Sequence, residues 1–599
     1  MANLELSAIS RQLLSLANPD LPLVQREQLT QIFQQLFVDL AAGHSCSRVE
    51  LLTEKLALNP AQIQDLLERS GLATLYLSVP LNVQATPLSY LALASGDLLY
   101  ISKYLAYELD LAQQVSQLGS NVPDYALDLQ SAACVKLEQL AARENKPNAE
   151  QLAAIIQSSQ QQFSIITGGP GTGKTTTVTL LLWLFYQIYG TELKVKICAP
   201  TGKAAVRVRE SIEHSVASLA SASDLGISLE CFAPLLAEPT NFGTLHKLLG
   251  YLPQNIYFRH HAQNLLEVEI LIVDESSMVG LPLFSKLLAA LDPTKLRHII
   301  LLGDKNQLSS VEEGYVFASL VNLRKISRDH QAYDLFAYHE KGLAAELVTS
   351  NRNQGEIYAL AQALLTQDAA LVAQILATGE QVKLYPAKLG QVLNYLFTRE
   401  DNPLLNYLDS AQLVSEFSQS SIKQLFAQLN QQAVLCLTNR GVLGCDNLNL
   451  QIERRIKQQI GHLDTWYSGR PIIILQNDYN LELFNGDIGI CVLDGDKVQI
   501  VFENGRQFIP EVLPAHSLAY AITIHKSQGS EYQQVNLVLP EMSQANEGTN
   551  LLSRELVYTG VTRAKSRVTI FSSQDLILHA MANHIQRNTG LSNFFKLEE

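Results

Sequence analysis

The residues with the clearest chemical potential form one short run, GGPGTGKTTT, at positions 168–177. Its glycines let the backbone curl so that N–H groups point inward, where they and the start of a helix can hold an anionic polyphosphate. In this GxxxxGK[ST] spacing, Lys174 reaches the β and γ phosphates and the Thr175 hydroxyl can bind Mg²⁺. The spacing predicts a nucleoside triphosphate as ligand. The residues expected to contact it are Gly168, Gly169, Pro170, Gly171, Thr172, Gly173, Lys174, Thr175 and Thr176.

Two adjacent carboxylates, Asp274 and Glu275, close the apolar run EILIV about a hundred residues later. A DE pair after a strand is common in proteins without catalytic activity. After a phosphate loop, however, Asp274 can hold Mg²⁺ while Glu275 polarises the attacking water, which is the division of labour that phosphoryl transfer to water needs.

A further apolar run, HIILLGD, leads into Asp304 and Gln307. Gln307 is well placed to sense the γ-phosphate or its water, whereas an isolated Asp304 would more commonly cap a turn. Arg352 and Arg563 could each supply a cation to the phosphoryl-transfer transition state. Either could instead be a surface arginine paired with a carboxylate, and only their position in a second α/β unit favours the catalytic interpretation.

These residues need a scaffold, and the pattern from about 126 to 325 predicts one. The apolar runs FSIIT, KVKICAP, EILIVDE and HIILLGD alternate with helical stretches, which indicates a parallel sheet with ligands at the carboxyl ends of its strands. A second α/β unit is predicted from about 345 to 575, with strands at AVLCLT, QVNLVLP and RVTIFSS. Between about 462 and 515, short β runs with Asn-Gly and Asp-Gly turns predict an inserted small barrel.

Residues 1–125 carry apolar residues at helical spacing, as in LTQIFQQLFVDLAAG, and predict a helical interaction domain without a catalytic pattern. The predicted boundaries are 1–125 for this domain, 126–335 for the first α/β domain and 336–599 for the second. A short hairpin is expected at about 250–266.

Composition narrows the class of protein. At 599 residues the chain needs several cores. The formal net charge of −14 argues against a protein that binds nucleic acid through an overall positive surface, so any DNA contact must be a local groove. The other interpretation of this charge is an acidic and apolar surface that partner subunits cover. The seven cysteines form no CxxC pair and are expected to be buried thiols. The N-terminus lacks a secretory pattern and no apolar run is long enough for a bilayer, so we expect a cytoplasmic protein without a membrane contact.

Taken together, the motifs resemble superfamily 1 helicases of the RecD type over about residues 145–575. The motifs are GGPGTGKTTT, APTGKAA (199–205), TLHKLLG (244–250), VDESSM (273–278), GDKNQLSSVEEG (303–314), AYAITIHKSQGSEY (519–532) and YTGVTRAK (558–565). The size of the N-terminal part, together with LFNGDIG and RELVYTGVTRAKSR, is similar to the alpha-subunit branch found in bacterial exonuclease V, the RecBCD complex. Stand-alone RecD-like helicases usually carry a longer N-terminal extension.

The resemblance implies an α/β fold of two RecA-like P-loop domains, with an N-terminal helical domain and an SH3-like β-barrel inserted in the second. It implies a motor that hydrolyses ATP with Mg²⁺, moves 5′ to 3′ on single-stranded DNA, and acts in recombinational double-strand break repair and DNA end degradation. RecB-like and RecC-like subunits would complete a heterotrimer. The same resemblance implies that the nuclease centre lies in another subunit. The sequence itself shows no convincing nuclease metal signature outside the ATP site.

By the same resemblance, Gln151 would contact adenine and Glu531 the nucleotide, Glu275 the water, and Gln307, Arg352 and Arg563 the γ-phosphate. Seen alone, Gln151 belongs to a capped helix start, NAEQ. The residues implied along the DNA strand are Pro200, Thr201, Thr244, His246, Thr523 and His525. Hydroxyl and backbone donors of this kind grip phosphates without reading bases.

The chain departs from the family pattern at Asn351, where an aromatic residue often precedes the arginine, and at Gly560, where alanine is usual. The hairpin YLPQNIYFRHH (251–261) lies where the family has a hairpin thought to split the duplex; an exposed hairpin without that role is the alternative. A regulatory ATPase that does not translocate is the competing function, although it would not need the TLHK and TIHKSQGSE segments.

Overall fold

A computed structural model gives the fold of the chain. It describes residues 2–595 with gaps at 81, 122–131, 145–146, 222–228, 253–254, 256, 310–312, 329–341, 350–354, 400–401, 413–417, 462–463, 479, 496 and 541–551.

The described strands of the first α/β unit form a six-stranded, wholly parallel sheet. Their order is β10 (Ala344–Leu347), β5 (Phe163–Gly168), β9 (His298–Gly303), β8 (Ile270–Val273), β6 (Val195–Ala199) and β7 (Phe242–Thr244). The four predicted strands are confirmed. They are mostly apolar because both faces are covered: Ile270 and Ile272 pack into one core, and the alternating Leu271 and Val273 into the other.

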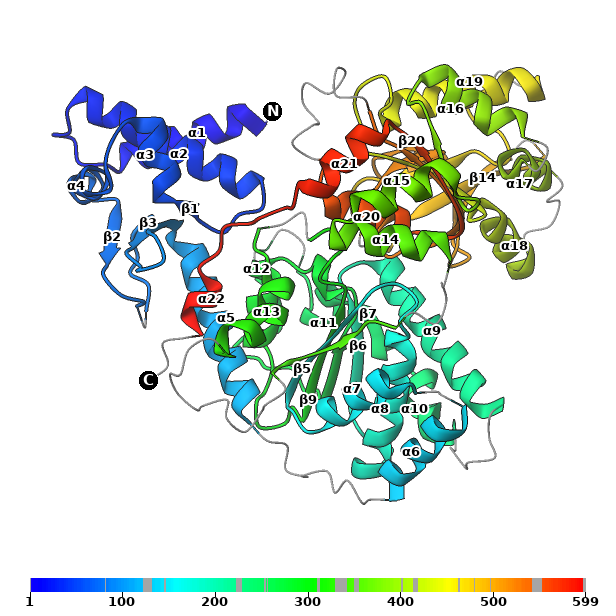
Figure 1. The fold of residues 1–599 in the computed structure, drawn as a ribbon, viewed down its shortest axis with the longest axis horizontal. Helices are drawn as coiled ribbons and strands as arrows, with labels where there is room; N and C mark the ends of the chain where they lie inside the picture. The colour runs from blue at the N-terminus through cyan, green and yellow to red at the C-terminus, as the bar shows by residue number, and fades with distance from the viewer. Residues whose placement is uncertain are drawn as a thin grey trace.

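Helices cover both faces of this sheet (Figure 1). The core on one face is built with α6 (Ala132–Glu144), α7 (Ala149–Ser159), α8 (Lys174–Tyr189), α9 (Gly202–Ser221) and α10 (Ala233–Ala237). The core on the other face is built with α5 (Ser102–Ser120), α11 (Leu245–Leu249), α12 (Leu281–Ala289) and α13 (Val316–Arg328).

The second α/β unit repeats this layered plan. Its described strands form a five-stranded parallel sheet in the order β11 (Val382–Tyr385), β20 (Ala564–Phe571), β19 (Tyr532–Val538), β12 (Gln432–Cys436) and β18 (Ala521–Thr523). The predicted strands AVLCLT, QVNLVLP and RVTIFSS are therefore confirmed. One face carries α14 (Glu356–Thr366), α15 (Ala369–Thr378), α20 (Arg554–Thr562) and α21 (Gln574–Ala582). The other carries α16 (Leu389–Thr398), α17 (Pro403–Gln412), α18 (Gln419–Leu429) and α19 (Cys445–Ile460).

A small antiparallel sheet interrupts the second unit, as the turn signals predict. Its described strands have the order β16 (Gln507–Phe508), β15 (Lys497–Phe502), β14 (Ile488–Asp494), β13 (Pro471–Ile474) and β17 (His516–Leu518). Gly495 and Gly505, in the turns on either side of β15, both have positive φ (58° and 82°), a conformation that glycine adopts without steric cost.

The N-terminal region corrects one prediction, because it is not purely helical. The helices α1 (Ala2–Ser15), α2 (Leu23–Ala41), α3 (Val49–Leu56) and α4 (Pro60–Ser70) accompany a described sheet of β1 (Ser47–Arg48), β4 (Leu98–Ile101), β3 (Leu88–Leu91) and β2 (Ala73–Tyr76). Each strand has at most four residues, too few to establish a period of two. Residues on the inner side of this sheet join the helices in a separate core.

The structure also shifts the predicted domain boundaries. Strand β10 lies beyond residue 335 but pairs with β5, so the first sheet extends past that boundary. Helix α5 lies before residue 126, yet it packs on the first sheet with α12. At the other end, α22 (Leu591–Phe594) lies after the second unit in sequence but packs against α5 and α13 of the first. Tertiary packing, which local sequence does not encode, decides all three placements.

The last segment of the chain links all parts of the molecule, and Figure 1 shows it, in red, running from α21 to α22 beside α5. Near its start, Ile585 N–H donates to the buried carboxylate of Glu555 in α20 (3.1 Å). Further on, Thr589 and Gly590 donate to Glu108 of α5, which also accepts from Ser45 and Tyr100. Glu108 is only 1% exposed, and burial raises its pKa.

Two further observations concern the chain as a whole. All seven cysteines are buried thiols, as expected from their spacing. Of the helices in the described ranges, none has the length and apolarity needed to cross a membrane.

Candidate active site

The glycine-rich run after β5 adopts the curled conformation expected of a phosphate loop. Gly171 and Gly173 have φ values of 78° and 83°, which L-residues with side chains rarely adopt. A Cβ on Gly168 would lie 2.6 Å from the Thr172 hydroxyl and 2.8 Å from the Leu347 carbonyl oxygen, so this position has no room for a side chain. Helix α8 begins at Lys174, directly after Gly173.

Lys174 lies over this loop. Its ammonium donates to the carbonyl oxygens of Gly168 (2.6 Å) and Gly169 (3.2 Å), and the Thr172 hydroxyl donates to the same Gly169 oxygen (2.8 Å). The predicted contacts Thr175 and Thr176 occupy the first turn of α8, where backbone N–H groups have no partner within the helix. A cation and a helix N-terminus at one place suit a polyphosphate.

The two carboxylates follow β8, which is separated from β5 by β9 alone. Glu275 has φ 50°, a left-handed conformation that costs a residue with a side chain of order 1 kcal/mol. Its N–H donates to Asp274 Oδ1 at 2.8 Å. Burial, and next the charge of Glu275, raise the pKa of Asp274, while the charge of Lys174 acts in the opposite direction.

The loop after β9 places Asp304 and Gln307 side by side. Asp304 Oδ1 accepts from the Asn306 N–H (3.0 Å), which is the turn cap that its sequence allowed. Its Oδ2 accepts from the Gln307 side-chain amide (3.1 Å), so Asp304 also orients Gln307. Both side chains are buried, and burial raises the pKa of Asp304.

Gln151 forms the helix start that its sequence indicates. It shares a capping box with Asn148, in which each backbone N–H donates to the other's side-chain oxygen. Its amide nitrogen donates to the Thr172 carbonyl (2.9 Å), so Gln151 helps to hold the backbone of the phosphate loop in place. Contact with adenine stays a prediction.

A cleft lies between the phosphate loop and the second unit. Gly168, Gly169 and Pro170 line one side, and Tyr358 of α14 with Tyr558 and Thr562 of α20 line the other. We call this boundary between the two α/β units the seam.

The second unit's predicted catalytic groups are placed unequally. Arg563 caps the C-terminus of α20 and donates to the carbonyl oxygens of Thr559 and Ser530 (both 3.2 Å), so both of these bonds stay within its own unit. Arg352 and Asn351 lie outside the described residues. Glu531 pairs with Lys565 (3.2 Å) and, across the seam, with Arg207 of α9 (3.4 Å). The roles of these side chains toward a nucleotide stay predictions.

The residues predicted to contact DNA gather at the ends of other strands. Three threonines share one geometry: the hydroxyl oxygen accepts the N–H of the residue three positions later. They are Thr201 after β6, Thr244 at the end of β7 and Thr523 at the end of β18. Each hydroxyl keeps its hydrogen, which can be donated to a phosphate oxygen.

Pro200 and two histidines accompany these threonines in sequence. Burial lowers the pKa of both His246 and His525, so both rings are neutral at neutral pH. The His246 ring lies edge-on to Tyr251 and Phe258, which pair as the base of the predicted hairpin.

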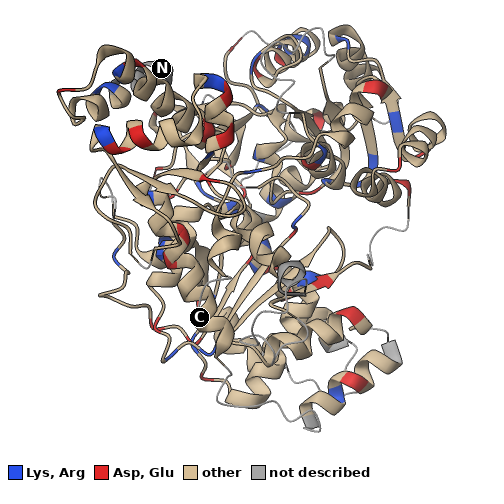
Figure 2. Cartoon of the chain, turned by 60° about the vertical axis from the view of Figure 1, so that its left-hand side comes forward, with Lys and Arg blue, Asp and Glu red and all other residues tan. Residues whose placement is uncertain are grey.

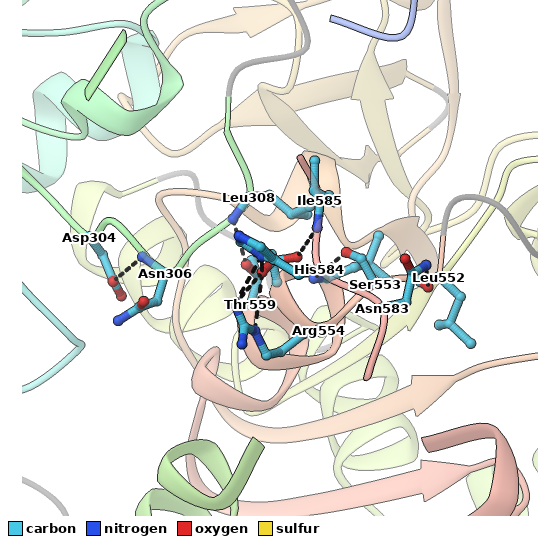
Figure 3. Close-up of polar contacts among 12 residues, drawn as sticks. Asp304, Asn306, Leu308, Leu552, Ser553, Arg554, Thr559, Asn583, His584 and Ile585 are labelled. Carbon is cyan, nitrogen blue, oxygen red and sulfur yellow. Dashed lines mark hydrogen bonds and ion pairs between the residues drawn. The ribbon is translucent and has the colours of Figure 1, made fainter. Parts of the chain in front are cut away.

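Sequence reasoning missed the side chains that join the two units. The Leu308 N–H donates to the Thr559 hydroxyl (3.0 Å), as Figure 3 shows, and the Gln528 amide donates to the Leu308 carbonyl (2.8 Å). Tyr558 donates to Asp304 Oδ2 (3.0 Å). Tyr558 and Thr559 lie inside the quoted segment YTGVTRAK, and Gln528 lies inside AYAITIHKSQGSEY. Which side chains of these segments face the first unit depends on how the two units pack. Gly560, one of the departures noted above, faces Leu537, and a Cβ there would approach its side chain to 2.8 Å.

Comparison with known proteins gives matches over both units. Residues 151–313 match the AAA domain family, and residues 518–571 match the UvrD-like helicase C-terminal domain family. The chain is 33% identical to the RecBCD enzyme subunit RecD of Haemophilus influenzae, over 77% of this chain and 74% of that protein. It is 35% identical to the protein of the same name from Mycolicibacterium smegmatis, over 83% of this chain and 82% of that protein.

More distant similarities also occur. The ATP-dependent RecD2 DNA helicase of Deinococcus radiodurans is 29% identical over 74% of this chain and 51% of its own length. Among solved structures, Bacteroides Pif1 bound to single-stranded DNA is 17% identical, with a TM-score of 0.36, over 72% of this chain and 93% of that one.

Proposed function

The chain belongs to the family of the RecBCD enzyme subunit RecD, and from that premise we propose that it is the 5′ to 3′ helicase subunit of such a complex. It is an ATP-dependent DNA helicase and hence an ATP hydrolase. In this role it acts in double-strand break repair by homologous recombination and in DNA end degradation.

The observation that carries the proposal is the cleft at the seam. A phosphate loop from one unit faces α20 of the other, the helix that ends at Arg563. A nucleotide held between two bodies can couple hydrolysis to their relative movement, which a translocating motor requires.

In the proposed reaction, the loop N–H groups and Lys174 bind the phosphates. Glu275 polarises the attacking water, and Gln307 orients it or senses the γ-phosphate. Arg563 would exchange its two carbonyl partners for a phosphate oxygen as the seam closes. Because a hydrogen bond between two charged groups is stronger than one to a neutral carbonyl, a bound triphosphate favours that exchange.

The residues at the site fit a magnesium ion. The Thr175 hydroxyl and the Asp274 carboxylate are hard oxygen donors, which Mg²⁺ prefers. Burial and the neighbouring Glu275 both disfavour the charged form of Asp274, a cost that a nearby divalent cation would offset. When bound, Mg²⁺ would neutralise charge on the phosphates.

Single-stranded DNA is proposed to cross the ends of β6, β7 and β18. The shared geometry of Thr201, Thr244 and Thr523 supports this path, because each can donate a hydroxyl hydrogen to the backbone of any sequence. Along the described ribbon, Figure 2 shows Lys and Arg interspersed with Asp and Glu rather than gathered in a run of one sign.

RecB-like and RecC-like subunits are the proposed partners, and the N-terminal region is the proposed contact. This region has its own core and exposes several large apolar side chains. They include Leu16 (65% exposed), Leu23 (74%), Val24 (63%) and Leu77 (85%). Exposed apolar side chains of this kind are typical of interaction sites when they are contiguous. We also propose that the inserted antiparallel sheet is the SH3-like barrel of this family, supported by its short strands and hairpin turns.

The decisive experiment measures strand displacement on a duplex with a 5′ overhang, using the chain co-expressed with its RecB-like and RecC-like partners. We expect the three proteins to co-purify, ATP hydrolysis to rise with single-stranded DNA, and unwinding to require the 5′ overhang. Hydrolysis that single-stranded DNA leaves unchanged, with no strand displacement, would instead indicate a regulatory ATPase.

A further inference from the structure

Helix α20 touches the first unit through a tyrosine that no part of the proposed mechanism uses. Tyr558 is 2% exposed and belongs to the core of the second unit, yet its hydroxyl crosses the seam to donate to Asp304 Oδ2 (3.0 Å). The hydroxyl also lies close to the phosphate loop, because a Cβ on Gly169 would lie 3.1 Å from the Tyr558 oxygen.

The acceptor of this bond is shared. The Gln307 side-chain amide donates to the same oxygen of Asp304 (3.1 Å), while the other carboxylate oxygen accepts from the Asn306 N–H. One carboxylate therefore receives a donor from the second unit, a donor from Gln307 and a donor from its own turn. Because a carboxylate with fewer donors can rotate, the tyrosine helps to fix the group that orients Gln307.

The chemistry of the pair makes Tyr558 a donor at all pH values of interest. Burial, and next the nearby charge of Asp304, raise the pKa of the Tyr558 phenol well above its usual value. Two other contacts, Leu308 N–H to Thr559 and Gln528 to the Leu308 carbonyl, hold the same loop against the second unit. Removing the Tyr558 hydroxyl therefore leaves the seam itself in place.

We propose that Tyr558 is a positioning residue for ATP hydrolysis, whose hydroxyl sets the orientation of Gln307 through their shared partner Asp304. The proposal rests on the proposed function in one respect, namely that Gln307 acts on the γ-phosphate or its water. Movement of α20 would thereby reach the hydrolytic centre through Asp304 as well as through Arg563.

The test is Tyr558→Phe, which keeps the buried ring and removes only the hydroxyl. In the complex with its partner subunits, we expect kcat for DNA-stimulated ATP hydrolysis to fall about 10-fold, as for loss of one charge-assisted hydrogen bond. The KM for ATP and the affinity for single-stranded DNA should change less than about 2-fold, because no binding group is removed. A KM that rises with no change in kcat would overturn the proposal.

Tyr407→Phe is the matched control. Tyr407 is a buried tyrosine of the same unit whose hydroxyl donates to a carbonyl, that of Gly469 (2.9 Å), away from the seam. Its loss should lower the melting temperature about as much as Tyr558→Phe does and leave kcat unchanged. Equal losses of kcat in the two variants would show a merely structural role and overturn the proposal.

A double variant tests whether Tyr558 and Gln307 act through the same carboxylate. Gln307→Ala alone should lower kcat, and Tyr558→Phe added to it should lower kcat no further, because both act through one group. If the two effects multiply, the tyrosine acts independently of Gln307 and this inference fails while the helicase function stands. If Gln307→Ala leaves kcat unchanged, the proposed role of Gln307 fails and this inference fails with it.

Discussion

The two α/β units share a layered parallel sheet but use opposite ends of it at the seam. In the first unit, the phosphate loop, Asp274 and Asp304 all follow the carboxyl ends of strands. In the second, Arg563 lies just before the amino end of β20, at the end of a helix that packs against the sheet. The sequence holds one GxxxxGK[ST] run, and it belongs to the first unit.

The same layered sheet architecture therefore serves two tasks, ligand binding in the first unit and the presentation of a helix in the second. The strand ends of the first unit present backbone N–H groups and carboxylates to a ligand, as open α/β sheets generally do. The second unit presents a helix, which can approach or withdraw as a body. At the DNA side the units are alike, because Thr244 and Thr523 both end strands and have the same hydrogen-bond geometry.

The largest loss of ATP hydrolysis is expected from a change in the first unit. Lys174→Gln removes a cation from the phosphate loop, so we expect kcat/KM for ATP to fall by about 10,000-fold, to background. Steady-state hydrolysis with saturating single-stranded DNA measures this. Substantial remaining turnover would place the hydrolytic site elsewhere. Lys196→Gln, at a half-buried lysine on β6 that donates to Thr240 and Asn241, is the control.

The second unit should act on turnover rather than on binding. Arg563→Ala is expected to lower kcat about 1,000-fold, the lower end of the effect of an arginine that stabilises a phosphoryl-transfer transition state. Binding of a fluorescent ATP analogue should change less than about 3-fold, since other groups hold the phosphates. Equal loss of binding and turnover would refute the separation of tasks between the units.

At the DNA side the two units should respond equally. Thr244→Val and Thr523→Val each remove one hydroxyl donor, so we expect each to weaken binding of single-stranded DNA about 3- to 10-fold. Fluorescence anisotropy with a labelled oligonucleotide measures this. The serine variants keep the hydroxyl and its bond to the backbone N–H, so they should bind normally. A loss in only one unit would mean that the strand runs over one sheet alone.

The smallest effect is expected away from the seam, at Glu108. Its pKa is raised in the folded chain, so its contribution to stability is full below the pKa of the unfolded chain and is lost as pH rises through the folded pKa. Glu108→Gln should therefore match the parent in stability at acidic pH and be the more stable of the two proteins at pH 7, with unchanged ATP hydrolysis.

Thermal unfolding at a series of pH values measures this difference. Asp65→Asn, at an exposed carboxylate paired with Arg69, serves as the control for the loss of a surface carboxylate. If Glu108→Gln is instead the less stable protein at pH 7, the four hydrogen bonds to Glu108 stabilise its charged form enough to outweigh burial.

Sequence reasoning worked best where chemistry or long apolar runs leave few choices. The phosphate loop, the DE pair and seven strands of the two sheets follow from spacing and hydrophobicity, because each is determined within a few residues. The N-terminal strands β2, β3 and β4 could not be found this way, since four residues such as LLYI fit a helix face equally well. Cross-seam contacts were missed for a different reason. Whether Tyr558 meets Asp304 depends on the relative position of two separately folded units, which no local pattern encodes.

The final segment of the chain has a mechanical consequence. Because it is hydrogen-bonded to Glu555 of α20 near its start and to Glu108 of α5 near its end, a displacement of α5 can reach α20 along this segment as well as through the packing of the two units. Any contact that shifts α5 would therefore also load the helix that ends at Arg563.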